Sequence, residues 1–70
     1  MNKIYLFTTF GRMEDFLLFA NARGILPSQI DTLTRKEEDG RIVFFVAVHA
    51  TPLDHATLQR FKTMLEGLDK

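Results

Sequence analysis

A nearly continuous apolar stretch, Ile42–Ala50, follows a polar turn that ends in Asp39-Gly40. An Asp-Gly pair between two extended segments is a strong signal for a β-hairpin. The stretch is too short to span a bilayer, and its nearly continuous apolar character indicates a central position in a sheet. We therefore expect Arg41–Ala50 to be a central strand, with one face formed by Ile42, Phe44, Val46 and Val48 and the other by Val43, Phe45, Ala47 and His49.

The first third of the chain predicts a strand followed by a helix. Lys3–Phe10 is rich in β-branched and aromatic residues, and we expect Gly11 to end this strand. Arg12–Arg23 predicts a helix, and Gly24 suits a left-handed C-cap. Leu18 lies off the apolar stripe of this helix, which indicates either a wide core face or a partner contact. The stripe itself consists of Met13, Phe16, Leu17 and Ala20.

A second strand and a second helix complete the pattern. Ile30–Arg35 alternates weakly and predicts a strand, with Asp31, Leu33 and Arg35 together on one of its faces. Thr51 and Pro52 suit the N-cap and the first position of a final helix. We expect this helix to end or fray near Gly67, and its apolar stripe consists of Leu58, Phe61, Leu65 and Leu68.

The predicted order is β-α-β-β-α, which favours an α+β two-layer sandwich in a single domain, residues 1–70. Its sheet is antiparallel, and both helices lie on one face, so the other face is bare. A large apolar side chain that stays exposed to water lacks the roughly 1.5–3 kcal/mol of stabilisation that its burial would provide. The bare face therefore predicts a partner that covers it. On the alternation of the strands, the residues of the bare face are Tyr5, Phe7, Leu33, Val43 and Phe45.

Size and composition also point to association. The chain has 70 residues, no Cys and a formal net charge of zero. A domain this small buries only about 60% of the surface that its unfolded chain exposes, and it usually needs a disulfide, a metal or a partner. Disulfides are excluded, and two His are too few for an evident metal site. We expect a soluble, cytoplasmic protein without cofactor or metal, which binds another protein or itself.

Part of the chain resembles the ACT domain, a small regulatory module with a ferredoxin-like fold. Gly11 stands where that family has Pro-Gly after its first strand, and Gly24-Ile25 is similar to the family's Gly-Ile-Asn. Ile30 falls where the family has an Ile in its second strand. Residues 40–48, Gly-Arg-Ile-Val-Phe-Phe-Val-Ala-Val, are similar to the family's third strand. The resemblance covers a little over half of the chain.

This resemblance implies a homodimer that binds a small amino-acid effector and regulates an enzyme in trans. The residues that it implies for ligand binding are Gly11, Arg12, Gly24 and Ile25.

No set of residues in the sequence predicts catalysis. His49 and His55 flank the last strand–helix turn beside Asp54, but general-base or metal chemistry needs convergent ligands or a positioned partner. Glu14 and Asp15 are neighbours near a helix start, where acidic residues complement the helix dipole. A nucleophile, a base and an oxyanion site are not assembled, so we expect a protein that is not an enzyme.

Nucleic-acid binding is an alternative, because RNA-recognition motifs share this order of elements and stack bases on aromatic residues of the first and third strands. Tyr5, Phe7 and Phe45 lie in those strands. A zero net charge weakens the attraction to phosphates that supplies much of the affinity. The leading hypothesis is therefore a small non-catalytic regulatory or inhibitory protein that binds a protein partner through its open sheet face or an exposed edge.

Overall fold

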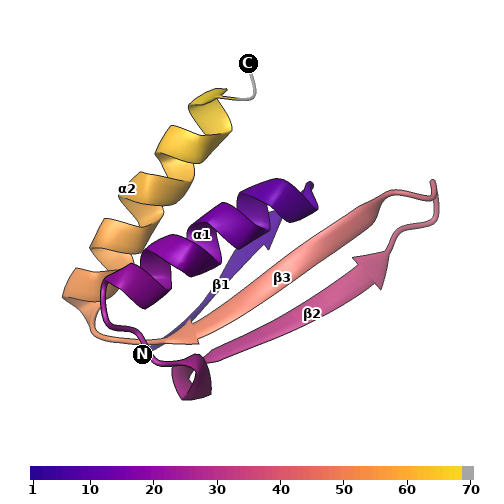
Figure 1. The fold of residues 1–70 in the computed structure, drawn as a ribbon. Coiled ribbons are helices and arrows are strands. Elements are labelled where there is room, and N and C mark those ends of the chain that lie inside the picture. The colour runs from indigo at the N-terminus through magenta and orange to yellow at the C-terminus, as the bar shows by residue number, and fades with distance from the viewer. Residues whose placement is uncertain (69–70) are drawn as a thin grey trace.

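The computed structural model describes residues 1–68. Its elements follow the predicted β-α-β-β-α order, with one added turn of 3₁₀ helix before the second strand (Figure 1). The elements are β1 (Asn2–Phe7), α1 (Phe10–Ala22), η1 (Pro27–Gln29), β2 (Ile30–Lys36), β3 (Ile42–His49) and α2 (Pro52–Leu68).

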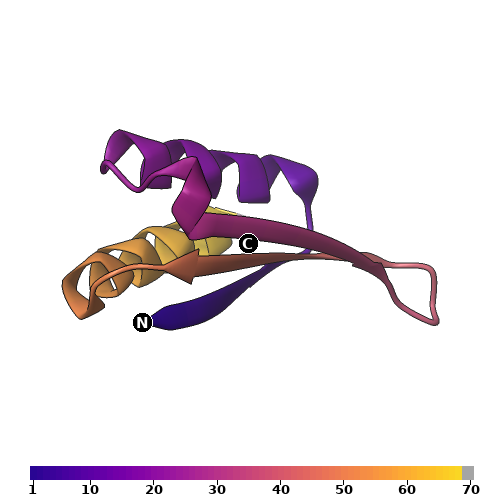
Figure 2. The same ribbon diagram turned by 90° about the horizontal axis from the view of Figure 1, so that it is seen from below.

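The three strands form one antiparallel sheet in the order β1-β3-β2, so β3 is central, as its sequence predicted. Both helices lie on one face of this sheet, and the β2–β3 hairpin extends beyond them (Figures 1 and 2). The fold is therefore the expected α+β sandwich of two layers. In the part of the chain that the structure describes, β1 and β2 each have a neighbouring strand on one side only, so both are edge strands.

The start of α1 differs from the prediction. The strand ends at Phe7, and Thr9 caps the helix, because its Oγ1 accepts a hydrogen bond from the backbone N–H of Arg12 at 3.3 Å. Gly11 therefore lies in the first helical turn and does not end the strand. Thr is favoured both in strands and at N-caps, so the sequence pattern did not separate the two roles.

The other helix boundaries are set by local hydrogen bonds. Gly24 has a φ of +89°, and the N–H groups of Gly24 and Ile25 bond to the carbonyls of Asn21 and Ala20, which is a Schellman C-cap. Thr51 Oγ1 accepts a hydrogen bond from the N–H of Asp54 at 3.1 Å and caps α2. Both caps confirm the sequence prediction.

The described part of α2 reaches Leu68 and so includes Gly67, within one residue of the expected end. A glycine inside a helix costs only about 1 kcal/mol relative to alanine. Leu58 and Leu65 are buried as expected, whereas Leu68 is 62% exposed and does not belong to the buried stripe.

One hydrophobic core lies between the helices and the sheet. Phe16 of α1 is fully buried and packs its ring against Tyr5 and Phe7 of β1, at centroid distances of 4.8 and 5.0 Å. Phe19 of α1 stacks on Phe61 of α2 at 4.0 Å, which joins the two helices. The core is completed by Met13, Ala20, Ile25, Val46, Val48, Ala50, Leu58 and Leu65.

A buried polar pair connects β1 to α2. The hydroxyl of Tyr5 lies 2.7 Å from Nδ1 of His55, and Nε2 of His55 lies 2.9 Å from the carbonyl oxygen of Met1. A carbonyl oxygen only accepts, so Nε2 carries the proton and donates it. In the neutral imidazole Nδ1 is then the acceptor, and the hydroxyl of Tyr5 donates to it. This pair satisfies a histidine that is only 3% exposed.

We expect Tyr5→Phe to lower the free energy of unfolding by about 1–3 kcal/mol at neutral pH, because it leaves buried Nδ1 of His55 without a donor. Urea unfolding followed by circular dichroism measures the loss. An unchanged midpoint and slope would show that the hydrogen bond contributes nothing.

Alkaline pH provides a second measurement on the same pair. Burial raises the pKa of the Tyr5 hydroxyl above its ordinary value of 10.0. The unfolded chain therefore loses this proton first as pH rises past 10, and we expect the free energy of unfolding to fall there. Tyr5 is the only tyrosine in the chain, so tyrosinate absorbance reports this residue directly. Tyr5→Phe should lack this component of the pH dependence; an identical decline in both proteins would contradict the assignment.

Candidate protein-binding face

The face of the sheet that the helices do not cover is apolar along its centre. Ile4, Leu6 and Leu33 are 62%, 50% and 65% exposed, and register places Leu6 and Leu33 on either side of Phe45. Six residues from three strands make up this surface, which we name the open face: Ile4, Leu6, Leu33, Val43, Phe45 and Ala47.

Polar groups border the open face. Asn2 and His49 pair across β1 and β3, with Oδ1 of Asn2 2.8 Å from Nδ1 of His49. Asp31 and Arg35 lie on the same side of β2, on either side of Leu33 along the strand. An apolar centre with a polar rim is the usual anatomy of a protein-binding surface.

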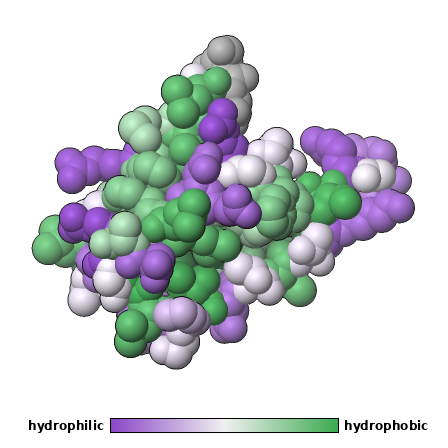
Figure 3. Space-filling model, in the orientation of Figure 1, coloured by the Kyte–Doolittle hydropathy of each residue, from purple (hydrophilic) through white to green (hydrophobic). Residues whose placement is uncertain are grey.

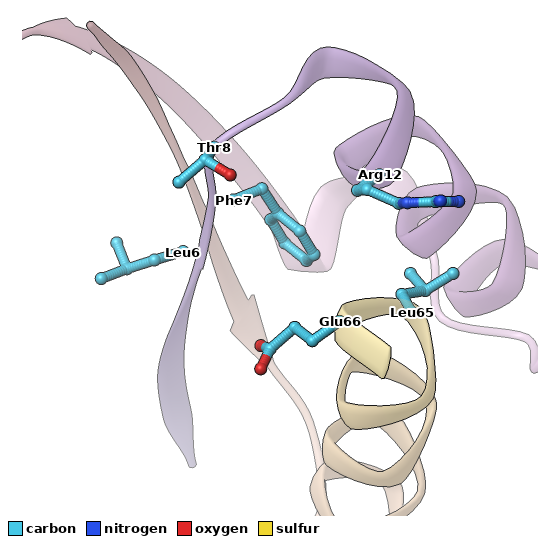
Figure 4. Close-up of a pocket in the computed structure, with 6 residues that line it drawn as sticks. All are labelled: Leu6, Phe7, Thr8, Arg12, Leu65 and Glu66. Carbon is cyan, nitrogen blue, oxygen red and sulfur yellow. The ribbon is translucent and has the colours of Figure 1, made fainter. Parts of the chain in front are cut away.

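The sequence prediction of this face was correct for two strands and wrong for the third. Leu33, Val43 and Phe45 lie on the open face, as expected. Tyr5 and Phe7 do not: they are 2% and 5% exposed and pack in the core. Figure 4 shows Phe7 directed towards the helices, with Leu6 on the opposite side of β1.

The physical reason for this error is that both faces of β1 are apolar, so alternation alone does not choose between them. The choice is made by contacts from other elements, namely Phe16 of α1 and His55 of α2.

The residues implied by the ACT resemblance lie at opposite ends of α1. Gly11 and Arg12 are in its first turn, whereas Gly24 and Ile25 follow its last turn. The 13 residues of α1 span about 20 Å at 1.5 Å per residue, so these four residues do not form one site within a chain. Ile25 is 4% exposed and belongs to the core.

Arg12 lines a small cavity of about 140 Å³ between the end of β1 and the two helices (Figure 4). Nη1 of Arg12 lies 3.4 Å from Oδ2 of Asp15. The lining is otherwise mostly apolar, and it consists of Leu6, Phe7, Thr8, Arg12, Leu65 and Glu66. This volume is far smaller than the roughly 300–1,000 Å³ of ordinary small-molecule sites.

The candidate chemical groups have structural roles. Both ring nitrogens of His55 are used inside the fold, and Nδ1 of His49 is paired with Asn2. Among residues 1–68, no group of three His, Asp or Glu side chains lies close enough together to hold a metal ion. No helix within these residues is both long and apolar enough to cross a membrane.

The aromatic platform expected for nucleic-acid binding is not assembled. Of Tyr5, Phe7 and Phe45, only Phe45 lies on the open face, because the other two rings are in the core. One aromatic ring does not provide the row of stacking surfaces that single-stranded RNA binds.

A second apolar surface was not predicted as a site. A groove of about 440 Å³ runs between α1 and β2 on the helix side of the sheet. Figure 3 shows hydrophobic side chains gathered over α1 and the segment that follows it, whereas the hairpin tip is hydrophilic. The sequence signal for this groove was Leu18, which lies off the buried stripe and is 62% exposed. The groove is lined by Glu14, Leu17, Leu18, Asn21, Ile25, Pro27, Ile30 and Thr32.

Comparison with models of protein families, with curated proteins and with solved structures gives no match to this chain. The ACT-like resemblance therefore stays a prediction, and the functional argument depends on the surfaces themselves.

Substitutions on the two faces of β1 test which of its residues lie in the core and which lie on the open face. We expect Phe7→Ala to lower the free energy of unfolding by about 3–5 kcal/mol, because it opens a cavity beside Phe16. Its neighbour Leu6, on the open face, is the matched control, and Leu6→Ala should cost about 1 kcal/mol or less. Urea unfolding measures both. A larger loss for Leu6→Ala than for Phe7→Ala would reverse the assignment of the faces.

Proposed function

We propose that this chain is a small non-catalytic regulatory or inhibitory protein, acting in the cytoplasm, that binds a protein partner through its open face. The observation that carries the proposal is the row formed by Leu6, Phe45 and Leu33 across all three strands. Contiguous exposed apolar surface of this kind marks interaction sites in soluble proteins. A chain without Cys also suits a compartment in which disulfides do not form.

The energetics support a partner that covers the centre of the face. Full burial of a large apolar side chain stabilises by about 1.5–3 kcal/mol, and Leu6 and Leu33 are 50% and 65% exposed. Phe45, between them, is only partly buried and has an aromatic ring at the centre of the patch. Central aromatic residues surrounded by apolar neighbours dominate the binding energy of many interfaces. The partner that fits is an apolar helix face or sheet face with few charges at its centre.

The non-catalytic part of the proposal is supported by the chemistry of the described residues. His55 is held in the core between Tyr5 and Met1, so its imidazole is not available to a substrate. The imidazole of His49 is paired with Asn2 on the rim of the face. Binding without a chemical step is what the remaining surface supports best.

Affinity capture from a lysate of the native source, with three matched variants, tests the proposal. We expect Leu6→Glu and Phe45→Glu to lose a protein that the wild-type chain captures, because each puts a charge into an apolar contact. Leu53→Glu is the control: Leu53 is 77% exposed on α2, away from the open face. The captured protein is then purified, and its dissociation constant should rise at least about tenfold with Phe45→Glu and stay unchanged with Leu53→Glu.

Circular dichroism confirms that each variant is folded before capture. If all three variants retain the same captured proteins, with unchanged dissociation constants, the open face is not the binding surface.

A further inference from the structure

The outer edge of β2 has unpaired backbone groups at defined residues. Glu37 and Arg41 form the next β2–β3 pair after Lys36 and Ile42, and the N–H of Glu37 donates to the carbonyl of Arg41 at 2.7 Å. Hydrogen-bonded pairs recur at every second residue of an antiparallel ladder. The backbone N–H and C=O groups of Leu33, four residues before Glu37, therefore also point towards β3. By the same alternation, the N–H and C=O groups of Thr32 and Thr34 point outward, where the described chain has no strand to receive them.

The sequence of β2 is complementary to itself when reversed about Leu33. On either side of Leu33 stand Thr32 and Thr34, and beyond them stand Asp31 and Arg35 with opposite charges. If two β2 strands pair antiparallel with Leu33 opposite Leu33, each Asp31 lies opposite an Arg35 of the other strand. Thr opposite Thr and opposite charges face to face are favourable cross-strand pairs.

We propose that the β2 edge binds the β2 edge of a second copy of this chain, antiparallel and centred on Leu33. Thr32 and Thr34 then exchange backbone hydrogen bonds with Thr34 and Thr32 of the second copy. Leu33 meets its own counterpart at a non-bonded pair, where opposing Cα atoms are about 4.5 Å apart and side chains are in closest contact. The contact is isologous and closes as a two-fold dimer.

The surfaces on both sides of the β2 edge favour a second copy of this chain as the binding partner. On the helix side, β2 adjoins the apolar groove, in which Leu17 and Leu18 of α1 lie beside Ile30. On the open face, Leu33 is 65% exposed. A second strand along this edge therefore covers apolar surface on both sides of the sheet. Ile30 is then opposite Lys36 of the second copy, whose alkyl stem can cover it while the ammonium remains in water.

The charged groups of β2 are available for the new pairs. Among residues 1–68, Arg35 is ion-paired with Glu37, with 3.6 Å between Nη2 of Arg35 and Oε2 of Glu37; the Arg35 side chain is 64% exposed and the Glu37 side chain is 31% exposed. Such exposed pairs contribute little, so Arg35 can turn to Asp31 of a second copy at small cost.

The outer edge of β1 is less suitable for self-pairing. On its helix side Lys3 donates to Gln59 of α2 at 3.0 Å, and Lys62 is ion-paired with Glu66. Lys3 is the one charged residue of β1, so two β1 strands have no opposite charges to align, whereas β2 supplies Asp31 and Arg35.

Charge exchange tests the proposed register by analytical ultracentrifugation. Asp31→Arg and Arg35→Asp each place like charges opposite one another in both symmetric pairs, so we expect each to raise the dimer dissociation constant at least about tenfold. A mixture of the two single variants restores opposite charges at both pairs and should form a heterodimer of near wild-type affinity. Glu38→Arg, which makes the same charge change at the exposed hairpin tip, is the control and should leave the dimer unchanged.

Disulfide trapping gives a second measurement that does not depend on these variants. The chain has no Cys, so Leu33→Cys introduces a single thiol. At a Cα separation of about 4.5 Å, two such thiols are within disulfide range, and mild oxidation should cross-link the dimer. Leu53→Cys, on α2, should remain largely uncrosslinked under the same conditions.

A wild-type chain that stays monomeric at millimolar concentration would overturn the proposal. A dimer that both single variants leave intact, or a mixture that does not restore association, would overturn it as well. The open face and the dimer contact share Leu33, but Leu6 lies on β1, on the far side of β3 from the β2 edge. Leu6→Glu should therefore keep the dimer and lose the partner, whereas Asp31→Arg should weaken the dimer. The two proposals therefore fail by different results.

Discussion

The burial of Tyr5, whose hydroxyl is hydrogen-bonded to Nδ1 of His55 and whose ring packs on Phe16, determines which face of β1 is in the core. The hydrogen bond ties the first strand to the last helix, and Tyr5 and Phe7 both pack against Phe16 in the core. Since neighbouring residues of a strand point to opposite faces, Ile4 and Leu6 are then turned outward. The composition of the open face is a direct consequence of the burial of Tyr5 and Phe7. The same histidine holds the carbonyl of Met1, which fixes the start of the strand.

The open face is uncovered because α1 and α2 both lie on the other face of the sheet (Figure 2). Among residues 1–68 no further helix or strand packs on it. Apolar residues on the open face therefore give the isolated chain only part of the stabilisation that full burial provides. A partner that covers Leu6, Phe45 and Leu33 recovers the remainder.

The features that local patterns determine were predictable from the sequence. Asp39-Gly40 located the hairpin, and Gly24 and Thr51 located two helix ends, because each depends on the conformation or side chain of one residue. The alternation of side chains along β2 and β3 also predicted correctly that Leu33, Val43 and Phe45 share one face of the sheet.

The features that non-local contacts determine were not predictable in this way. The buried face of β1 depends on His55, which is 50 positions away from Tyr5 in the sequence. The groove beside Leu18 depends on where α1 crosses the sheet relative to Ile30. The role of Thr9 as a cap depends on competition between two conformations that both suit threonine. For Tyr5 and for the groove the deciding partner is distant in the sequence, whereas the partner of Thr9, the N–H of Arg12, is local and only the choice between strand and cap was open.

An exposed edge strand next to an apolar face is a hazard for a small protein, because it can pair with any extended chain. The charges of β2 restrict this pairing. If two β2 strands slip by two residues towards the hairpin, Asp31 comes to lie opposite Glu37 of the other copy, and like charges oppose each other. Pairing centred on Leu33 avoids this conflict and matches Asp31 with Arg35. The two-fold axis of that arrangement is perpendicular to the sheet, so both open faces lie on the same side. Self-association through the β2 edge would thereby extend the surface that binds a partner, and the two interactions are compatible in one molecule.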